Sequence, residues 1–375
     1  MINTPLVTVS DARSAAKRRL PRMIFDYIDG AAGNEYGCGI NQSRLEEIRL
    51  QPRVLVNTED RSLKKTLFGR EWDLPFGIAP MGMCNLSWPG GDEMLAAAAV
   101  KHNIPVGLST MASSSIEQTF DRAGTHAWFQ LYVGQSEEVA FNMVDRARIC
   151  GYETIMLTVD VPILAPRPRE RRNGFQSPVK IGPRQFLDFA IHPQWSIRTL
   201  LTGIPKIANN ENDLGQKKFV RNESRGKVDW GFLDRLRNHW KGNLIVKGVL
   251  HCEDAVRIRD AGVDGVYISN HGGRQLDSAP AAIDTLGLIR EAVGRDYPLL
   301  FDSGVRNGES VIKALAMGAD FVLMGRPFLY GMGANGQQGL EEIIRYMREE
   351  INVGLTQLGK TDINDVDSGV LFSLP

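Results

Sequence analysis

The feature that most constrains the fold is a series of eight short apolar runs between residues 76 and 325, most of them followed by a segment of helical character. Runs that are apolar throughout and bounded by turn residues are typical of parallel strands covered on both faces. The runs are FGIAP (76–80), IPVGLS (104–109), AWFQLYV (127–133), TIMLTVD (154–160), NLIVKG (243–248), DGVYISN (264–270), PLLFDS (298–303) and DFVLMG (320–325). Eight consecutive strand–helix units predict an α/β fold, a closed (β/α)8 TIM barrel. A doubly wound open sheet is the alternative, but it seldom contains eight such units in a row.

The segment before the first run has a different pattern and predicts helices. Capping residues stand at 8–11, helix formers follow from Ala15, and Pro21 interrupts them before a second helical stretch that ends in glycines at 30–33. We therefore expect a single domain over residues 1–375, in which an N-terminal helical segment precedes a barrel at about 74–350.

One gap in the repeat is much longer than a crossover requires. About 80 residues separate the fourth and fifth runs, and residues 165–228 carry 13 Lys and Arg against 5 Asp and Glu. This long insertion after strand 4 also contains an apolar, aromatic stretch at 186–201. One interpretation is a mobile, basic surface insertion at about 176–228 whose charges are solvated. The other is a lid with an interfacial helix, in which 180–220 makes peripheral contact with anionic lipid.

Composition excludes several classes of protein. The chain has 44 Lys and Arg against 44 Asp and Glu, whereas a general nucleic-acid binder usually carries a basic excess. No run of 18 apolar residues is present, and the N-terminus lacks the apolar core of a signal peptide. The four cysteines (Cys38, Cys84, Cys150 and Cys252) form no CxxC pair, so we expect reduced thiols, no metal site and a cytoplasmic location.

The carboxyl ends of the strands build the active site of a barrel, so polar residues at these ends are candidates for function. The runs end with Pro80, Met81, Gly82, Ser109, Gln130, Tyr132, Thr158, Asp160, Lys247, Ser269, Asn270, His271, Asp302, Gly325 and Arg326. Together they would bring a base, a carboxylate, a lysine, a tyrosine and arginines to one mouth.

The last two units carry a pattern that suits a phosphate. Residues 302–308 form a glycine-containing turn that opens a helix, and Gly325-Arg326-Pro327 follows the eighth run. Backbone N–H groups at a helix start and arginine side chains bind phosphate, and this fold commonly holds one after strands 7 and 8.

His271 follows the sixth run beside two glycines and Arg274. A lone histidine is more often structural, bonded to a neighbouring carbonyl. Here Asp160 could orient the imidazole and stabilise its protonated form. Arg274 and Arg167 could hold a substrate carboxylate in bidentate fashion.

These residues resemble a known family. The run SNHGGRQLD (269–277) is similar to the signature of the FMN-dependent (S)-2-hydroxy-acid oxidases and dehydrogenases. The resemblance extends in order through FDYIDGAAGNEYG (25–37), IAPMG (78–82), WFQLYV (128–133), LTVDVP (157–162), VKG (246–248), FDSGVRNG (301–308) and MGRP (324–327). It covers about residues 8 to 360 and is greatest to the (S)-mandelate dehydrogenases and the respiratory-type L-lactate dehydrogenases.

The resemblance implies roles for the site residues. His271 would be the base, paired with Asp160; Tyr132 would contact the substrate hydroxyl, and Lys247 would stabilise the reduced flavin of FMN. The substrate carboxylate would lie against Arg167, Arg274 and Tyr27. The flavin would contact Pro80, Met81, Gly82, Ser109, Gln130, Thr158 and Ser269, and the ribityl phosphate Asp302, Ser303, Gly304, Val305, Arg306, Gly325 and Arg326.

Three positions depart from the family pattern. Prolines flank Arg167, where relatives often have an R-E-R-D run, so Arg169 is an alternative carboxylate ligand. Gly82 stands where many oxidases have Ala, which resembles the dehydrogenases. Met111 stands where glycolate oxidase has Trp, and with Leu164 it suggests an apolar pocket open to a larger side chain.

The function implied is FMN-dependent oxidation of an (S)-2-hydroxy acid, mandelate-like or lactate, to the 2-oxo acid, with reoxidation by a quinone or another electron carrier. The alternative is an oxidase that reduces O2 to H2O2. Isomerase or nucleotide chemistry on an FMN barrel would not explain His271, Asp160 and Arg274, and a non-catalytic flavin protein would be expected to lack His271 or Arg274. Relatives often form tetramers, so a homo-oligomer is expected, on the inner face of the membrane if the insertion binds lipid.

Overall fold

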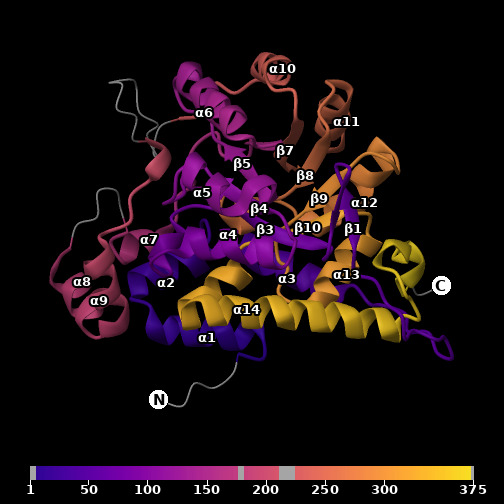
Figure 1. Ribbon diagram of the computed structural model, residues 1–375, viewed down its shortest axis with the longest axis horizontal. Helices are drawn as coiled ribbons and strands as arrows, with labels where there is room; N and C mark the ends of the chain where they lie inside the picture. The colour runs from indigo at the N-terminus through magenta and orange to yellow at the C-terminus, as the bar shows by residue number, and fades with distance from the viewer. Residues whose placement is uncertain (1–5, 176–180, 211–223, 373–375) are drawn as a thin grey trace.

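A closed barrel of eight parallel strands forms the centre of the protein (Figure 1). The computed structural model describes residues 6–175, 181–210 and 224–372. The strands are β3 (Phe76–Met81), β4 (Val106–Ser109), β5 (Ala127–Leu131), β6 (Thr154–Thr158), β7 (Asn243–Val249), β8 (Gly265–Ile268), β9 (Leu299–Phe301) and β10 (Phe321–Met324). Because β10 pairs with β3, the sheet has no edge strand. The predicted TIM barrel is confirmed and the open sheet is excluded.

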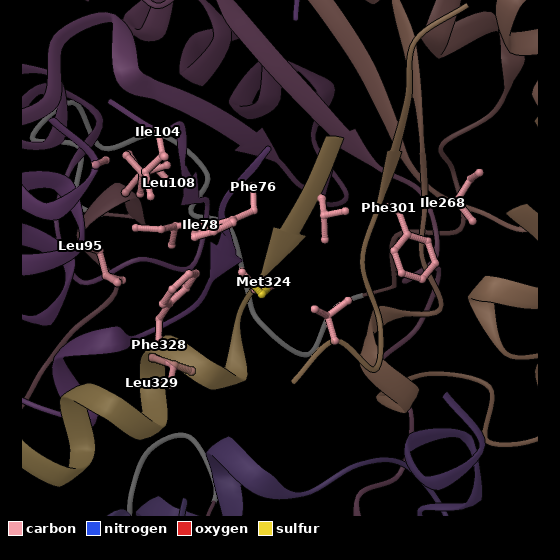
Figure 2. Close-up of a cluster of buried hydrophobic side chains, with 14 of the residues drawn as sticks. Phe76, Ile78, Leu95, Ile104, Leu108, Ile268, Phe301, Met324, Phe328 and Leu329 are labelled. Carbon is pink, nitrogen blue, oxygen red and sulfur yellow. The ribbon is translucent and has the colours of Figure 1, made fainter. Parts of the chain in front are cut away.

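Helices alternate with these strands and cover the outside of the barrel. They are α4 (Gly91–Lys101), α5 (Ile116–Ala123), α6 (Glu137–Cys150), α10 (Trp230–His239), α11 (Cys252–Asp260), α12 (Ala282–Val293), α13 (Gly308–Ala316) and α14 (Arg326–Gln357). Figure 2 shows how the two layers meet: the Phe328 ring of α14 points toward Phe76 and Ile78 of β3, and the Phe76 and Phe328 rings are 6.4 Å apart.

A hairpin that the sequence analysis did not predict closes the amino end of the barrel. Its strands are β1 (Lys65–Leu67) and β2 (Arg70–Trp72). Leu67 and Trp72 join the side chains inside the barrel, and the Trp72 ring lies 6.0 Å from that of Trp128. The barrel interior is therefore filled by side chains at its amino end. A site can form at the other end, where the carboxyl ends of the strands lie.

The two predicted N-terminal helices are α1 (Val9–Arg19) and α2 (Arg22–Asp29), and a third helix, α3 (Tyr36–Glu47), follows the glycines. The Thr8 side chain caps α1 by accepting a hydrogen bond from the Asp11 N–H. Helix α1 packs along α14 (Figure 1), where a β-carbon on Gly333 would lie 2.9 Å from Leu20 and 3.2 Å from Ala16. The close approach explains why a glycine is present there.

The insertion after β6 forms α7 (Pro168–Arg172), α8 (Pro183–Ala190) and α9 (Pro193–Thr202). The apolar stretch at 186–201 is thus two short helices, which extend to one side of the molecule (Figure 1). Trp195 fastens them to the barrel because its indole N–H donates to the Leu86 carbonyl at 2.7 Å. Parts of the predicted insertion, 176–180 and 211–223, lie outside the described residues.

Many apolar side chains of the insertion face solvent. They are Ile181, Phe186, Leu187, Ile191, Ile197, Leu200, Leu201 and Ile204, each at least 55% exposed. Across the described ranges, no helix combines the length and the apolarity that crossing a bilayer requires.

Candidate active site

A cavity opens at the carboxyl ends of the barrel strands, with about 1230 Å³ of empty space, part of it continuous with solvent. Most of the predicted site residues line it: Tyr27, Pro80, Met81, Gly82, Ser109, Tyr132, Arg167, Lys247, His271, Arg274, Asp302, Ser303, Gly304, Val305, Arg306, Gly325 and Arg326. Six of the described lining side chains are Lys or Arg, whereas only Asp302 is acidic. The cavity is therefore suited to anionic ligands.

His271 stands between a carboxylate and a phenol. Its Nδ1 lies 3.0 and 3.1 Å from the two carboxylate oxygens of Asp160, and its Nε2 lies 3.3 Å from the Tyr132 hydroxyl. Asp160 does not line the cavity, so it acts on a ligand through His271. Burial lowers the pKa of His271, although the Asp160 carboxylate opposes this shift. The imidazole is therefore neutral at pH 7 and able to accept a proton.

The turn that carries His271 is built from the residues around it. His271 has φ 60° and Gly272 φ 63°, a left-handed conformation that glycine adopts freely and histidine does not. The His271 N–H donates to the Ser269 hydroxyl, and the Gly272 N–H donates to the Ser303 hydroxyl. These bonds hold the imidazole at the cavity although the backbone is strained.

Two arginines converge on one buried carboxylate beside His271. Arg274 Nη2 and Arg167 Nη1 donate to the same Glu170 oxygen, at 3.0 and 3.3 Å. The Nε of Arg167 is buried and has no hydrogen-bond partner among the described residues. Burial and the nearby Arg167 charge lower the pKa of Arg274 to about 10, so it stays protonated at neutral pH. Two guanidinium groups that share one acid retain a net positive charge for a ligand carboxylate.

The structure separates the two candidate carboxylate ligands of the insertion. Arg167 lines the cavity, whereas Arg169 points elsewhere and bonds Asp29 at 2.6 Å and Glu35. Sequence reasoning missed Glu170, because its role depends on a contact with Arg274 from another strand end.

Lys247 lies at the floor of the cavity. It falls within β7, which continues to Val249, rather than at the strand end as expected. Its Nζ donates to the Ser269 hydroxyl at 2.6 Å and lies 3.1 Å from Asp302. Burial alone would raise the pKa of Asp302, but Lys247 and the hydroxyl donors around it lower that pKa, so the carboxylate is ionised at neutral pH.

The turn after β9 forms the end of the cavity predicted for phosphate. Ser303 and Gly304 have φ 83° and 95°, and a β-carbon on Gly304 would lie 2.4 Å from the Asn41 carbonyl oxygen, so only glycine fits. Arg306 lies in this turn, just before α13. Arg326 differs from expectation, since its three guanidinium nitrogens donate to the carbonyls of Ile28, Gly272 and Gly30. The Arg326 guanidinium is therefore engaged by backbone carbonyls, and Arg306 is better placed to bind a phosphate.

Three predicted flavin residues do not line the cavity, namely Gln130, Thr158 and Ser269. Gln130 bonds the Ser109 hydroxyl and the Thr158 hydroxyl, each at 3.0 Å, and Ser269 accepts from Lys247. These three side chains thus position residues that line the cavity, such as Ser109 and Lys247. Their direct contact with the flavin stays a prediction.

The wall near Gly82 is aromatic and apolar. The Tyr27 hydroxyl donates to the Gly82 carbonyl at 3.1 Å, and its ring stacks on Phe175 at 4.4 Å. Met111 and Leu164 both line the cavity, and a β-carbon on Gly82 would come within 3.0 Å of the Met111 β-carbon. Glycine at position 82 therefore keeps this part of the cavity open.

Arg225 also lines the cavity and was not predicted. It is 5% exposed, and its guanidinium carbon lies 4.8 Å from the centre of the Tyr132 ring. Nothing in the basic tract distinguished it from the other arginines and lysines of the insertion.

The FMN implied by the sequence resemblance fits this cavity. The lining runs from Pro80–Gly82, across Lys247, to the turn at 303–306, so a planar ring and a ribityl phosphate can lie along it. The basic excess matches an anionic cofactor, and Lys247 would supply positive charge to stabilise the reduced flavin.

The comparisons with known proteins agree over the whole chain. The model of the FMN-dependent dehydrogenase family matches residues 16–373. The chain is 38% identical to (S)-mandelate dehydrogenase of Pseudomonas putida (98% of this chain, 94% of that protein) and 37% identical to L-lactate dehydrogenase of Pseudomonas syringae pv. syringae strain B728a (97% and 98%). Solved structures that resemble it include the monotopic membrane protein (S)-mandelate dehydrogenase (TM-score 0.94, 37% identity, 99% of this chain and 100% of that chain) and a mandelate oxidase (0.82, 32%, 96% and 97%). This chain is therefore a member of the FMN-dependent dehydrogenase family, an enzyme whose cofactor is FMN.

Proposed function

We propose that this enzyme oxidises an (S)-2-hydroxy acid to the 2-oxo acid. The observation that carries the proposal is His271, bonded to Asp160 on one side, facing Tyr132 on the other and lying beside the Arg167–Arg274 pair. Relatives with 37–38% identity are dehydrogenases of mandelate and lactate, which are both 2-hydroxy acids.

The residues divide the work as follows. Arg167 and Arg274 bind the substrate carboxylate and so fix the position of the carbon that carries the hydroxyl group. Tyr132 contacts that hydroxyl, and neutral His271 accepts a proton while Asp160 stabilises the imidazolium that forms. Bound FMN would supply the acceptor for the two electrons and the second hydrogen that the acid loses. Lys247 supplies positive charge next to it throughout.

The electron acceptor in this proposal is a quinone or another carrier at a membrane. The exposed apolar side chains of α8 and α9 form a surface that suits the interfacial region of a bilayer. The similar mandelate dehydrogenase is described as a monotopic membrane protein. The chain would then work as one domain, in a homotetramer, at the cytoplasmic face of the membrane.

Membrane contact is testable by sedimentation with vesicles that contain anionic lipid. Replacing Leu200 and Leu201, both 82% exposed, by Asn should release the protein into the supernatant with its flavin retained. A matched double Asn variant at Ile149 and Leu288, which are exposed on barrel helices, should sediment like the natural protein. Equal sedimentation of all three proteins would refute the membrane assignment.

The reaction itself is tested by mixing the flavin-loaded enzyme anaerobically with (S)-mandelate, (S)-lactate and their (R)-enantiomers. The proposal requires bleaching of the oxidised flavin by at least one (S)-acid and little by the (R)-acids. Adding a quinone analogue or air to the reduced enzyme then compares the acceptors. Fast reoxidation by air with formation of H2O2 would identify an oxidase, the activity of the similar mandelate oxidase.

A further inference from the structure

We propose that Asn41 is a positioning residue for the base: by pairing with Asn270 it holds His271 in the orientation that accepts the substrate proton. The inference rests on the proposed function, because it adds a residue to the same reaction. Asn41 belongs to α3 and is not among the described residues that line the cavity, so it acts on a substrate through His271.

The side chains of Asn41 and Asn270 form a reciprocal amide pair. The Asn41 Nδ2 donates to the Asn270 Oδ1 at 2.7 Å, and the Asn270 Nδ2 donates to the Asn41 Oδ1 at 2.8 Å. The two residues are 1% and 5% exposed, so water does not compete for these bonds. Loss of one amide would leave buried polar atoms of the other without a partner, which is costly in a place of low dielectric constant.

Asn270 passes this constraint to the base because it directly precedes His271. Its Oδ1 also accepts from the Gly273 N–H at 3.1 Å, and its Nδ2 donates to the Pro280 carbonyl at 3.1 Å. The Asn270 side chain thus spans the short turn that contains His271, whose φ of 60° is strained. A strained turn relaxes unless the bonds around it prevent this. Without the amide pair, we expect the imidazole to move away from its working position.

Helix α3 holds Asn41 at the junction of the base turn and the phosphate turn. The Asn41 Oδ1 accepts from the Ala282 N–H, at the start of α12, at 3.2 Å. The Asn41 carbonyl is the group that a β-carbon on Gly304 would approach to 2.4 Å. One turn earlier in α3, the Gly37 N–H donates to the Asp277 carboxylate, beyond the base turn, at 2.9 Å. Asn41 is therefore itself fixed and able to fix Asn270.

The binding of the substrate carboxylate should survive loss of the pair. The Arg274 Nη1 donates to the Tyr27 and Gly30 carbonyls at 2.9 and 2.7 Å, and these contacts do not involve Asn41. A positioning role therefore predicts a lower rate of the chemical step with little change in substrate affinity. A role in stability alone predicts less folded or less flavin-loaded protein, but a natural rate for each bound flavin.

The test compares Asn41→Leu, which has a similar size and no polar side-chain atom, with Asn41→Asp, which retains the acceptor oxygens. The control is Lys313→Met. The Lys313 side chain is buried and donates to the Leu45 carbonyl at 3.1 Å, so the control loosens the end of the same helix and leaves the amide pair in place. Anaerobic flavin reduction by (S)-mandelate and (S)-lactate is measured per bound FMN, in the natural and the His271→Ala backgrounds.

Asn41→Leu should lower the limiting rate of flavin reduction on the order of 10- to 100-fold and change the apparent Kd of the substrate by less than about 3-fold. Asn41→Asp should show a smaller loss, of about 3- to 10-fold, and Lys313→Met should stay within about 2-fold of the natural rate. In the His271→Ala background, Asn41→Leu should change the residual rate by less than about 2-fold, because the residue acts through the base.

Hydrogen exchange provides a readout that does not depend on turnover. Exchange in residues 270–277 should rise in Asn41→Leu and remain unchanged in Lys313→Met. Circular dichroism and FMN content show whether each variant is folded, and Asn41→Asp carries the test if Asn41→Leu is not.

A natural rate per bound flavin in the Asn41 variants, or an equal loss in the natural and His271→Ala backgrounds, would overturn the proposal. Failure of the proposed function is a different result, because the natural enzyme itself would then not be reduced by these (S)-acids.

Discussion

His271 shows at the scale of one residue how burial and a partner charge adjust a base. Its pKa is lowered from the ordinary value of 6.5, first by burial, while the Asp160 carboxylate raises it. A base with a lowered pKa is neutral and active above that pKa and loses activity as the pH falls through it.

We therefore expect kcat/KM to be level around pH 7 and to fall only at a pH below 6.5. In Asp160→Asn the carboxylate is absent, so the midpoint should move to lower pH, and the plateau should fall about 10²- to 10⁴-fold because the imidazolium is no longer stabilised. Profiles of kcat/KM against pH for the two proteins check this. A midpoint above 6.5, or one that Asp160→Asn moves upward, would contradict the assignment.

Met111 tests the size of the cavity near Gly82. Replacing it by Trp should crowd the wall that Gly82 leaves open, where the two residues already approach closely. We expect kcat/KM for (S)-mandelate to fall on the order of 10- to 100-fold, and that for (S)-lactate to fall much less. Equal losses for both acids would show that Met111 does not limit the side chain of the substrate. Leu288→Trp on α12, which is exposed, serves as the control.

The residues of the site differ in how far the sequence could predict them. Those at strand ends, such as His271 and Asp302, follow from the fold, because the ends of all parallel strands meet at one mouth. Glu170 and Arg225 lie in the insertion, and their places depend on packing between segments far apart in the chain. No local pattern marks such residues.

At the scale of elements, strand–helix units were predictable because each strand is an apolar run between turn residues. The hairpin of β1 and β2 was not, since each strand has three residues and only Leu67 and Trp72 are buried. The division of 186–201 into α8 and α9 follows from Pro193, which begins the second helix.

Trp195 attaches these two helices to the barrel. Its ring lies 5.4 Å from Phe189, and its N–H bonds Leu86. Trp195→Ala should remove about 3 kcal/mol of docking free energy and raise hydrogen exchange in 181–208 about 100-fold, with little change in the barrel. Leu200→Ala, at an exposed position, should leave the exchange as it was. Unchanged exchange in Trp195→Ala would show that other contacts hold α8 and α9.

At the scale of the whole molecule, Asp29 joins helices from distant parts of the chain. This carboxylate of α2 accepts hydrogen bonds from Arg13 of α1 at 2.6 Å, Arg169 of α7 at 2.6 Å and Tyr330 of α14 at 2.7 Å. Burial alone would raise its pKa, but these donors lower it well below the ordinary value, so the carboxylate is charged at neutral pH. The Asp29 carboxylate thus links the N-terminal helices, the insertion and the last helix.

Asp29→Asn should lower the free energy of unfolding by about 1–3 kcal/mol, because an amide cannot replace the charge-assisted bonds. Asp121→Asn, at an exposed position on α5, should change it by less than about 0.5 kcal/mol. Urea unfolding of the FMN-loaded proteins measures both. Equal stability of the two variants would mean that the Asp29 contacts contribute nothing measurable.

The central claim is that this barrel mouth oxidises an (S)-2-hydroxy acid on FMN with His271 as the base. The most direct test is anaerobic stopped-flow reduction of the natural enzyme and His271→Ala by (S)-mandelate and (S)-lactate, with dithionite as a reductant that needs no base. We expect rapid bleaching of the natural enzyme by at least one acid, a rate at least about 100-fold lower in His271→Ala, and complete bleaching of both by dithionite. Equal rates in the two proteins, or bleaching by dithionite alone, would contradict the account.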